Sequence, residues 1–193
     1  MAADAFHLRP ATLADCDALR ALIAQSAAEL SAKYYEPRQV DAALKGAFGV
    51  DTSLVRDGTY FVAESARALI GCGGWSRRKT MFGGDQFSAR DAALLDPGSE
   101  AARIRAFFVH PEWARKGVGR AILERCETEA TRAGFASFEL MATLPGVPFY
   151  LACGYRNRAP VRFNLAPGVE IEFVPMEKSS ASSEGSRISD RAD

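Results

Sequence analysis

The sequence contains few of the residues from which metal centres and disulfide frameworks are built. Its 193 residues include two histidines and four cysteines. The cysteines are scattered along the chain and form no Cys-x-x-Cys pair, so neither a metal site nor a disulfide scaffold is expected. Instead, the sequence predicts buried, free thiols at Cys16, Cys72, Cys126 and Cys153.

Neither sign of charge is in excess, and no long apolar run is present. Lysine plus arginine and aspartate plus glutamate number 24 each, so no net charge would draw the chain to nucleic acid or to an anionic membrane. No apolar run approaches the length that spans a bilayer, and residues 1–4 lack the basic start of a secretory signal. These features predict a cytoplasmic protein without nucleic-acid or membrane partners.

The chain does have enough apolar material to form one domain. Hydrophobic residues make up 48% of the sequence, which can supply a sizeable core. Periodicity predicts a helix that is capped at Thr12 or Asp15 and reaches Leu30. Further helices are predicted over 37–44 and 117–133 and around Phe149, and strands over 6–9, 59–64, 68–76, 103–109, 136–142, 161–165 and 169–174. Composition alone fits either an α/β or an α+β fold.

Two segments fall outside this pattern. Residues 80–101 form a long connection with Gly83-Gly84 near its tip and a helical turn expected around 89–95. Connections of this length in compact domains are usually functional, so we expect a flap beside a binding cleft. After Lys178 the sequence becomes serine-rich and polar, which predicts a domain over 6–178 and a flexible tail over 179–193.

The most informative segment is 109–123. An apolar run ends at His110-Pro111, a short basic loop with Gly117 and Gly119 follows, and an amphipathic helix starts directly from that loop. Helix N-termini bind phosphate because their first N–H groups lack partners and carry the positive end of the dipole. Positive charge around the loop comes from Arg115, Lys116 and Arg120. This layout favours a phosphate cradle over an ordinary strand-to-helix turn, and it lacks the further residues of a dinucleotide fingerprint or a P-loop.

A second motif lies in residues 142–155, where Phe149-Tyr150 is followed by Gly154-Tyr155. In this order and spacing, the two motifs resemble the signatures of the GCN5-related N-acetyltransferase (GNAT) superfamily. Those signatures are Q/R-x-x-G-x-G/A for the acyl-CoA loop and N-x-x-A-x-x-F-Y-x-x-x-G-F/Y for the later segment. The chain departs from them at Ala114, with the arginine displaced to Arg115, at Thr143 and at Gly146. The resemblance implies an α/β (α+β) acyl-CoA N-acyltransferase fold, with a central mixed, mostly antiparallel sheet flanked by helices.

The resemblance also implies acetyl-CoA as the acyl donor, and no metal. Acetyl-CoA is expected between the strand that ends at Val109 and the strand that begins near Ala136. The Val109 N–H is the expected donor to the thioester oxygen, and such a donor is commonly worth about 3 kcal/mol. Tyr150 is expected to act as the general acid that protonates the departing thiolate. The expected acetyl-CoA contacts are Phe108, Val109, Arg115, Lys116, Gly117, Val118, Gly119, Arg120, Phe149 and Tyr150.

The general base is not assigned by the resemblance. Relatives often carry a glutamate on the strand that precedes the phosphate loop, but here that strand carries Arg103 and Arg105. Glu139, Glu64 and Asp85 remain as alternatives that could act through water. Histidine is a common general base, but the place of His110 before Pro111 indicates a local structural role.

The expected activity is N-acetylation of a small-molecule or peptide amine by direct attack in a ternary complex. The cysteines have no histidine partner in the motifs, which argues against an acyl-enzyme. Acceptor contacts are expected at Tyr34, Tyr35, Asp85 and Glu139. The alternative is a non-catalytic acyl-CoA-binding regulatory module, which the missing strand carboxylate favours. The oligomeric state is left open, with a homodimer among the options.

Overall fold

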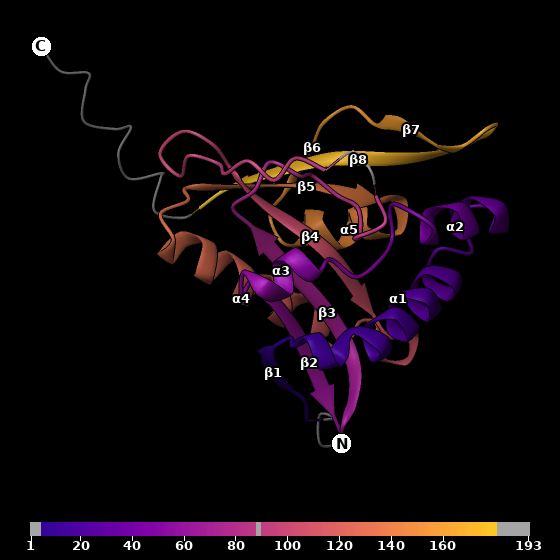
Figure 1. Cartoon of the computed structure of the whole chain (residues 1–193), viewed down its shortest axis with the longest axis horizontal. Helices are drawn as coiled ribbons and strands as arrows, with labels where there is room; N and C mark the ends of the chain where they lie inside the picture. The colour runs from indigo at the N-terminus through magenta and orange to yellow at the C-terminus, as the bar shows by residue number, and fades with distance from the viewer. Residues whose placement is uncertain (1–4, 88–89, 181–193) are drawn as a thin grey trace, which may run out of the picture.

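A computed structural model describes residues 5–87 and 90–180 of the chain. Its helices are α1 (Cys16–Leu30), α2 (Pro37–Leu44), α3 (Thr52–Arg56), α4 (Val118–Arg132) and α5 (Val147–Ala152). Its strands are β1 (His7–Pro10), β2 (Tyr60–Ser65), β3 (Ala68–Ser76), β4 (Ala102–Val109), β5 (Ser137–Thr143), β6 (Arg156–Asn157), β7 (Val161–Ala166) and β8 (Val169–Ser179). Figure 1 shows α1 and α3 in front of the strands, with α4 behind them.

The strands form one mixed sheet in the order β1-β2-β3-β4-β5-β8-β6, and β7 pairs with β8. Every pairing is antiparallel except that of β4 with β5, which is parallel and short. Ala102 lies opposite Phe138, and Arg103 opposite Glu139. Beyond these two pairs the strands diverge, as Figure 1 shows. The fold class predicted from the sequence is confirmed.

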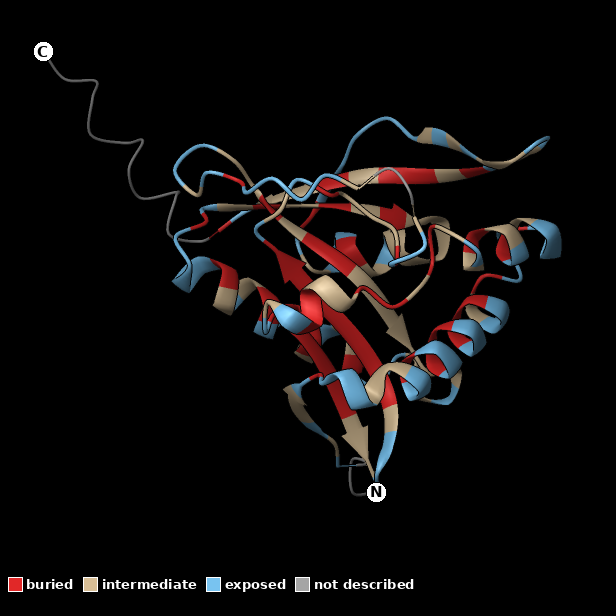
Figure 2. Cartoon of the chain, viewed as in Figure 1, coloured by how far each residue is buried: buried red, intermediate tan, exposed pale blue. Residues whose placement is uncertain are grey.

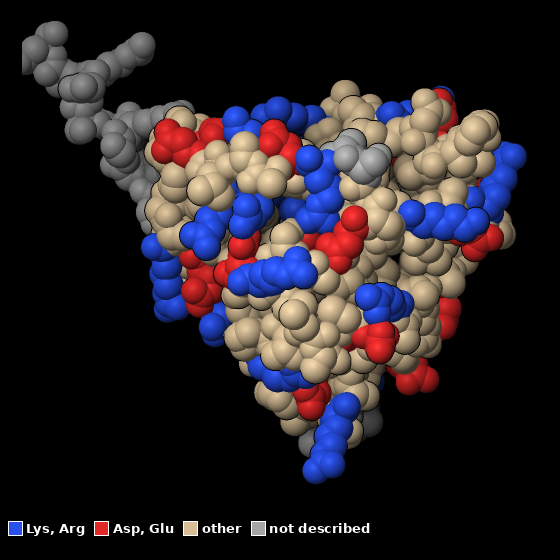
Figure 3. All heavy atoms as spheres, viewed as in Figure 1, with Lys and Arg blue, Asp and Glu red and all other residues tan. Residues whose placement is uncertain are grey.

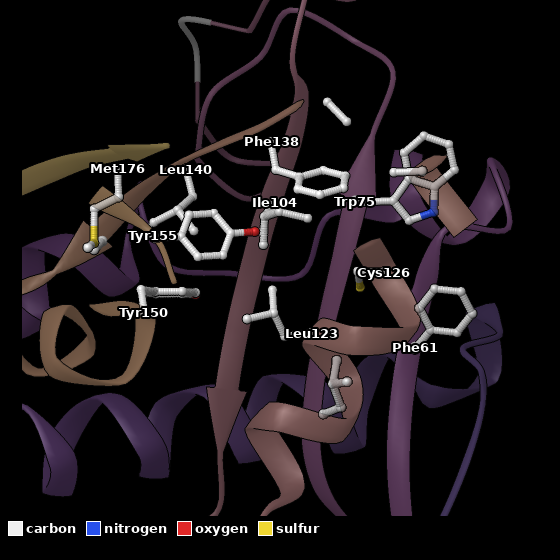
Figure 4. Packing of buried hydrophobic residues seen from close by; sticks show 14 of the residues in the cluster. Phe61, Trp75, Ile104, Leu123, Cys126, Phe138, Leu140, Tyr150, Tyr155 and Met176 are labelled. Carbon is white, nitrogen blue, oxygen red and sulfur yellow. The ribbon is translucent and has the colours of Figure 1, made fainter. Parts of the chain in front are cut away.

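Each face of the sheet has its own hydrophobic core, and Figure 2 shows the buried residues concentrated on the central strands. One core contains α4, α5 and the facing residues of β2–β5, with Ile104, Leu123 and Phe138 pointing toward one another (Figure 4). The other core contains α1, α2 and α3 against β2, β3 and β8. The sheet is therefore covered on both faces. The strands β4 and β5 separate within this sheet, between the helices of the two faces.

Most predicted elements are confirmed within a residue or two of their ends. The helix predicted over 117–133 is α4, and its inner row is buried along its whole length, from Val118 to Ala130. Pro37 opens α2 at its first turn, and Gly134 follows α4 with φ of 95°. In the β7–β8 hairpin, Arg162 lies opposite Glu172, and their side chains are 3.6 Å apart. Turn and cap residues therefore lie where these elements begin and end.

The structure also corrects several expectations. Helix α3 and strand β6 were not predicted, because each is very short. The helical turn expected around 89–95 is wrong over its described part, 90–95, which instead runs antiparallel to 77–80. The amide nitrogen of Lys79 lies 2.9 Å from the Ala93 carbonyl oxygen, and that of Leu95 lies 2.8 Å from the Arg77 carbonyl oxygen. The flexible tail predicted over 179–193 is wrong at its first two residues, because β8 extends to Ser179 and the amide of the buried Ser180 donates to the Ala136 carbonyl at 2.8 Å. Residues 181–193 lie outside the described residues.

No helix among the described residues is both long and apolar enough to cross a bilayer. The four cysteines are all free, with Cys72 and Cys126 buried and the other two partly exposed. The visible face of the molecule carries basic and acidic side chains interspersed, as Figure 3 shows.

Candidate functional site

The candidate site lies where β4 leaves β5. After Arg103 the backbone of β4 no longer pairs with β5, so no neighbouring strand occupies that side of β4. Ala106 has a φ of 54°, and the β3–β4 register shifts between Cys72 and Gly74. This bulge, of the kind that redirects strands beside binding sites, bends β4 away from its neighbour.

Two glycines of β3 make room for the elements around this bulge. A Cβ atom on Gly73 would lie 2.6 Å from the Phe107 ring, and one on Gly71 would lie 2.6 Å from the Val118 side chain. The glycine-rich segment 71–74 therefore contains both a β-bulge and close approaches of neighbouring side chains. The glycines let Phe107 and the first turn of α4 lie directly on the strand.

The loop before α4 has the geometry of an anion cradle. Gly117 caps the helix with φ of 87°, a left-handed conformation that suits glycine, and a Cβ there would meet nothing within 4 Å. The first intrahelical bond is from the Ala121 nitrogen to the Gly117 oxygen, at 3.0 Å. The amides of residues 118–120 therefore precede the helical ladder and can donate to a phosphate.

The cradle meets β4 and α5 at Gly119. A Cβ atom on Gly119 would lie 3.4 Å from Phe149 Cζ and 3.6 Å from Val109 Cγ2. Arg115, Lys116 and Arg120 are exposed around the same loop. The Lys116 ammonium lies 5.0 Å from the centre of the Trp113 ring, and Arg120 donates to the Ala152 carbonyl at 3.3 Å. The structure thus brings all the predicted phosphate-loop residues together at the end of β4.

Tyr150, the predicted general acid, is buried on α5 at the edge of this site. Its ring packs against those of Phe107, Phe149 and Tyr155, with centroids 4.9 to 6.3 Å away. Burial raises the pKa of the phenol well above its usual range. The group therefore holds its proton at neutral pH, as an acid must. Figure 4 shows its ring beside Leu123 and Tyr155.

The Val109 amide, the predicted oxyanion donor, lies against helix α1. Its nitrogen is 3.3 Å from Ser26 Oγ, and Ser26 is buried. Ser26 was not expected from the sequence, because a serine on the inner face of a helix carries no distinctive signal. Phe108, the other predicted main-chain contact, packs its side chain on the α1–α3 face.

The two predicted acceptor tyrosines differ in their surroundings. Tyr34 is 49% exposed, whereas Tyr35 is 5% exposed. The Tyr35 hydroxyl donates to the Glu172 carbonyl at 2.7 Å and accepts from the Leu144 amide at 2.8 Å. Burial raises the pKa of Tyr35 to about 12. Tyr35 therefore ties the α1–α2 connection to β8 and to the residue that follows β5.

The carboxylates considered as bases or acceptor contacts all have partners. Glu64 accepts from Arg9 at 2.8 Å, and Glu139 accepts from Arg103. Asp85 accepts from the Thr52 amide at 3.0 Å. His110 Nδ1 lies 3.3 Å from the Glu112 amide nitrogen, within the turn after β4, in agreement with a local structural role.

A buried ionic cluster links β4 to the long connection, and the sequence did not predict it. Arg105 and Asp51 are 2.7 Å apart, and both side chains are essentially inaccessible. Arg90, on the long connection, donates to the other Asp51 oxygen at 2.5 Å, and Arg105 donates to the Gly83 carbonyl at 2.9 Å. Burial lowers the pKa of Arg105 to about 10, although the charge of Asp51 opposes the change. The one sequence signal for this pair is that Arg105 lies within an otherwise apolar strand, where a buried arginine needs a partner of opposite charge.

Comparison with known proteins agrees with this geometry. A family model described as an acetyltransferase (GNAT) domain matches residues 56–157. No curated protein sequence matches the chain significantly.

Solved structures share the fold over nearly their whole length. A GCN5-related N-acetyltransferase from Rhodopseudomonas palustris superimposes with a TM-score of 0.69 at 18% identity, covering 93% of this chain and 98% of its own. The PaiA N-acetyltransferase from Thermoplasma acidophilum, solved in complex with coenzyme A, superimposes with a TM-score of 0.62 at 14% identity. The match covers 91% of this chain and 99% of that protein. A ribosomal-protein-alanine N-acetyltransferase from Brucella melitensis superimposes with a TM-score of 0.58 at 16% identity. The match covers 90% of this chain and 99% of that protein.

Proposed function

We propose that this chain, which belongs to the GNAT acetyltransferase family, transfers an acetyl group from acetyl-CoA to an amine by direct attack in a ternary complex. The acceptor is a small-molecule or peptide amine. Acyl-CoA-dependent acetyl transfer is the activity of the family, and the mechanism assigned to this chain's residues is our proposal. The cytoplasm is the proposed location, since free cysteines suit a reducing compartment.

The proposal rests mainly on the position of the cradle, which lies at the end of β4 where this strand no longer pairs with β5. Gly119, in the cradle, lies beside Val109 at the end of the strand, since a Cβ atom placed on Gly119 would be 3.6 Å from Val109 Cγ2. A pyrophosphate on the amides of residues 118–120 would leave the rest of an acyl-CoA free to follow β4. The thioester would then lie beside the Ala106 bulge and Tyr150.

The proposed chemistry balances without a covalent enzyme intermediate. The amine nitrogen attacks the thioester carbonyl carbon, and the carbonyl oxygen gains negative charge that the Val109 N–H stabilises. The carbon–sulfur bond then breaks, and its electron pair leaves with sulfur. Tyr150 gives its proton to this thiolate, the former amine nitrogen loses a proton to water, and the Tyr150 phenolate takes a proton back from solvent. Cys72 is not a candidate nucleophile, because burial raises its thiol pKa to about 12.

The long connection supports a further part of the proposal, that it borders the acceptor as a flap. Phe82 packs against Phe163 of β7 at 4.7 Å and Phe173 of β8 at 5.3 Å between ring centroids. Arg90 and Gly83 fasten the connection to Asp51 and Arg105. These contacts lie on the face of the sheet that carries α1 and α2. In this arrangement Asp85 holds the connection in place through Thr52.

The test is free-thiol release from acetyl-CoA across a panel of amines, combined with calorimetric titration of acetyl-CoA. Acceptor-dependent release with formation of the acetylated amine is expected. Tight acetyl-CoA binding without release for any amine would instead identify a non-catalytic acyl-CoA-binding module. Absence of acetyl-CoA binding would contradict both functions.

A further inference from the structure

Six phenylalanines gather on the α1–α3 side of the β4 bulge, and we call them the phenylalanine wall. Five segments of the chain supply them. Ring centroids are 5.8 Å apart for Phe48 and Phe108, 6.3 Å for Phe48 and Phe173, and 4.9 Å for Phe82 and Phe87. The members of the phenylalanine wall are Phe48, Phe82, Phe87, Phe108, Phe163 and Phe173.

The phenylalanine wall is not sealed like an ordinary core. Phe48 and Phe173 are buried, but the other four members are partly exposed. Phe108 belongs to the strand expected to hold the thioester, and Phe82 belongs to the flap. The wall therefore spans the space from the acyl donor to the flap. A flat apolar body can stack against such rings, because aromatic pairs favour edge-to-face and offset contacts.

The charges next to the wall are already paired with one another. Arg105 precedes Ala106 at the bulge, and its Nε and Nη1 atoms are buried without a hydrogen-bond partner. The groups that face it are the Asp51 carboxylate, the Arg90 guanidinium, the Tyr60 hydroxyl and the Gly83 carbonyl. Arg90 also lies 3.4 Å from Asp85, so two arginines are paired with two carboxylates at this place. An ammonium ion brought here would lose hydration and add a third cation beside two arginines, since buried charges of one sign disfavour each other.

The described carboxylates nearest the bulge all have an arginine partner. Asp51 is fully buried and divided between Arg105 and Arg90, and Asp85 lies 3.4 Å from Arg90. Glu139 pairs with Arg103, at the closed end of the β4–β5 divergence. A cationic acceptor would find each of these carboxylates already paired with an arginine.

We infer that the acceptor is an aromatic amine that is uncharged at neutral pH, bound with its ring against the phenylalanine wall. This inference rests on the proposed acetyl transfer and names its substrate class. An aniline nitrogen already carries its lone pair unprotonated at pH 7, so it needs no base before it attacks the carbonyl carbon. Sulfur leaves with the bonding pair and takes the Tyr150 proton, and the new amide nitrogen gives its extra proton to water. The products are an acetanilide and coenzyme A.

The experiment compares isomeric amines with the wild-type protein at pH 7. 4-Methylaniline and benzylamine have the same atoms, but the first is neutral and the second is an ammonium ion. We expect kcat/KM for 4-methylaniline to exceed that for benzylamine at least about tenfold, with spermidine and a lysyl peptide lower still. Equal or higher kcat/KM for benzylamine, spermidine or the peptide would overturn the inference while supporting acetyl transfer. No transfer to any amine would overturn both.

A pair of variants tests the wall directly. Phe82→Ala removes a partly exposed ring of the wall, whereas Leu151→Ala removes a 47% exposed side chain of α5. We expect Phe82→Ala to lower kcat/KM for 4-methylaniline about tenfold or more with an unchanged acetyl-CoA Kd, and Leu151→Ala to leave both unchanged. Unchanged acetyl-CoA binding also verifies that Phe82→Ala is folded. Retained selectivity in a folded Phe82→Ala protein would place the acceptor away from the wall.

Discussion

The Ser26 hydroxyl oxygen lies 3.3 Å from the Val109 backbone nitrogen, so helix α1 touches the strand that presents the proposed thioester donor. If acetyl-CoA takes this N–H, the serine loses its bond when the acyl donor binds. A net hydrogen bond of this kind is worth about 1 kcal/mol. The contact therefore bears on both stability and acyl-donor affinity.

Ser26→Ala should separate these two effects. We expect kcat to stay within about twofold of wild type, acetyl-CoA to bind no more weakly, and unfolding to cost about 1 kcal/mol less. Ser31→Ala, at another buried serine of the same helix end, is the matched control and should not change acetyl-CoA affinity. A tenfold or greater loss of kcat in Ser26→Ala alone would mean that the hydroxyl itself takes part in the reaction.

Gly119→Val tests the phosphate cradle. The branched side chain would project where Phe149 and Val109 already lie 3.4 and 3.6 Å from the Cβ position, so we expect acetyl-CoA binding to be lost while the fold is kept. Gly98→Val, which places the same side chain on an exposed turn, is the control and should bind acetyl-CoA with wild-type affinity. If calorimetry shows unchanged affinity of a folded Gly119→Val protein for acetyl-CoA, the cradle does not bind the pyrophosphate.

Tyr150→Phe keeps the ring packing and removes the proton donor. General acid catalysis contributes roughly 10²- to 10⁴-fold, so we expect kcat to fall by that range with little change in the acetyl-CoA Kd. Tyr155→Phe is the control, because its hydroxyl instead binds Glu127 at 3.0 Å. It should lower stability and leave kcat intact. Wild-type turnover in Tyr150→Phe would mean that the thiolate leaves without this acid.

Arg90→Met tests the flap. The change releases the long connection from Asp51 but leaves Arg105 to compensate that carboxylate. We expect a higher KM for the amine and an unchanged Kd for acetyl-CoA, measured by initial rates and calorimetry. The exposed Arg132→Met should alter neither. An equal loss of affinity for both substrates, or unaltered amine kinetics, would exclude a flap role.

Acid pH should weaken the fold through Asp57. Arg78 donates to both Asp57 oxygens at 2.7 Å, and these bonds lower the aspartate pKa below its usual value. A carboxylate with a lowered folded pKa stabilises the protein above its unfolded pKa, about 4, and that stability is lost as the pH falls through the folded pKa. In urea unfolding, Asp57→Asn should therefore be less stable than wild type at pH 7, with the difference shrinking toward pH 3. A pH-independent difference would contradict this role, and the exposed Asp17→Asn is the control.

The fold was predictable because its main signals are local. Apolar periodicity predicted α1 and α4, and the cap predicted at Thr12 or Asp15 marked where α1 begins. The phosphate loop was equally visible, since its chemistry depends on glycines and backbone amides adjacent in sequence. The short α3 was missed because one helical turn carries too little periodicity.

The acceptor side was not predictable in the same way, because it is assembled from distant segments. Asp51 and Arg105 are 54 positions apart in the numbering, and the sequence does not indicate that they meet. The phenylalanine wall likewise draws on five segments whose rings individually resemble ordinary core residues. The structure locates Glu64, Glu139 and Asp85 in pairs, which a list of candidate carboxylates could not reveal.

The place of β8 has a consequence for how the protein is made. This last described strand covers the free edge of β5 along residues 137–143 and also carries β6 and β7. A ribosome releases β5 well before β8, so the nascent chain holds an unpaired, largely apolar strand edge until residues 173–179 emerge. Such edges invite association with other chains. Chaperones should therefore bind the nascent chain most strongly between the release of β5 and that of β8. A chain that lacks residues 173–179 should aggregate.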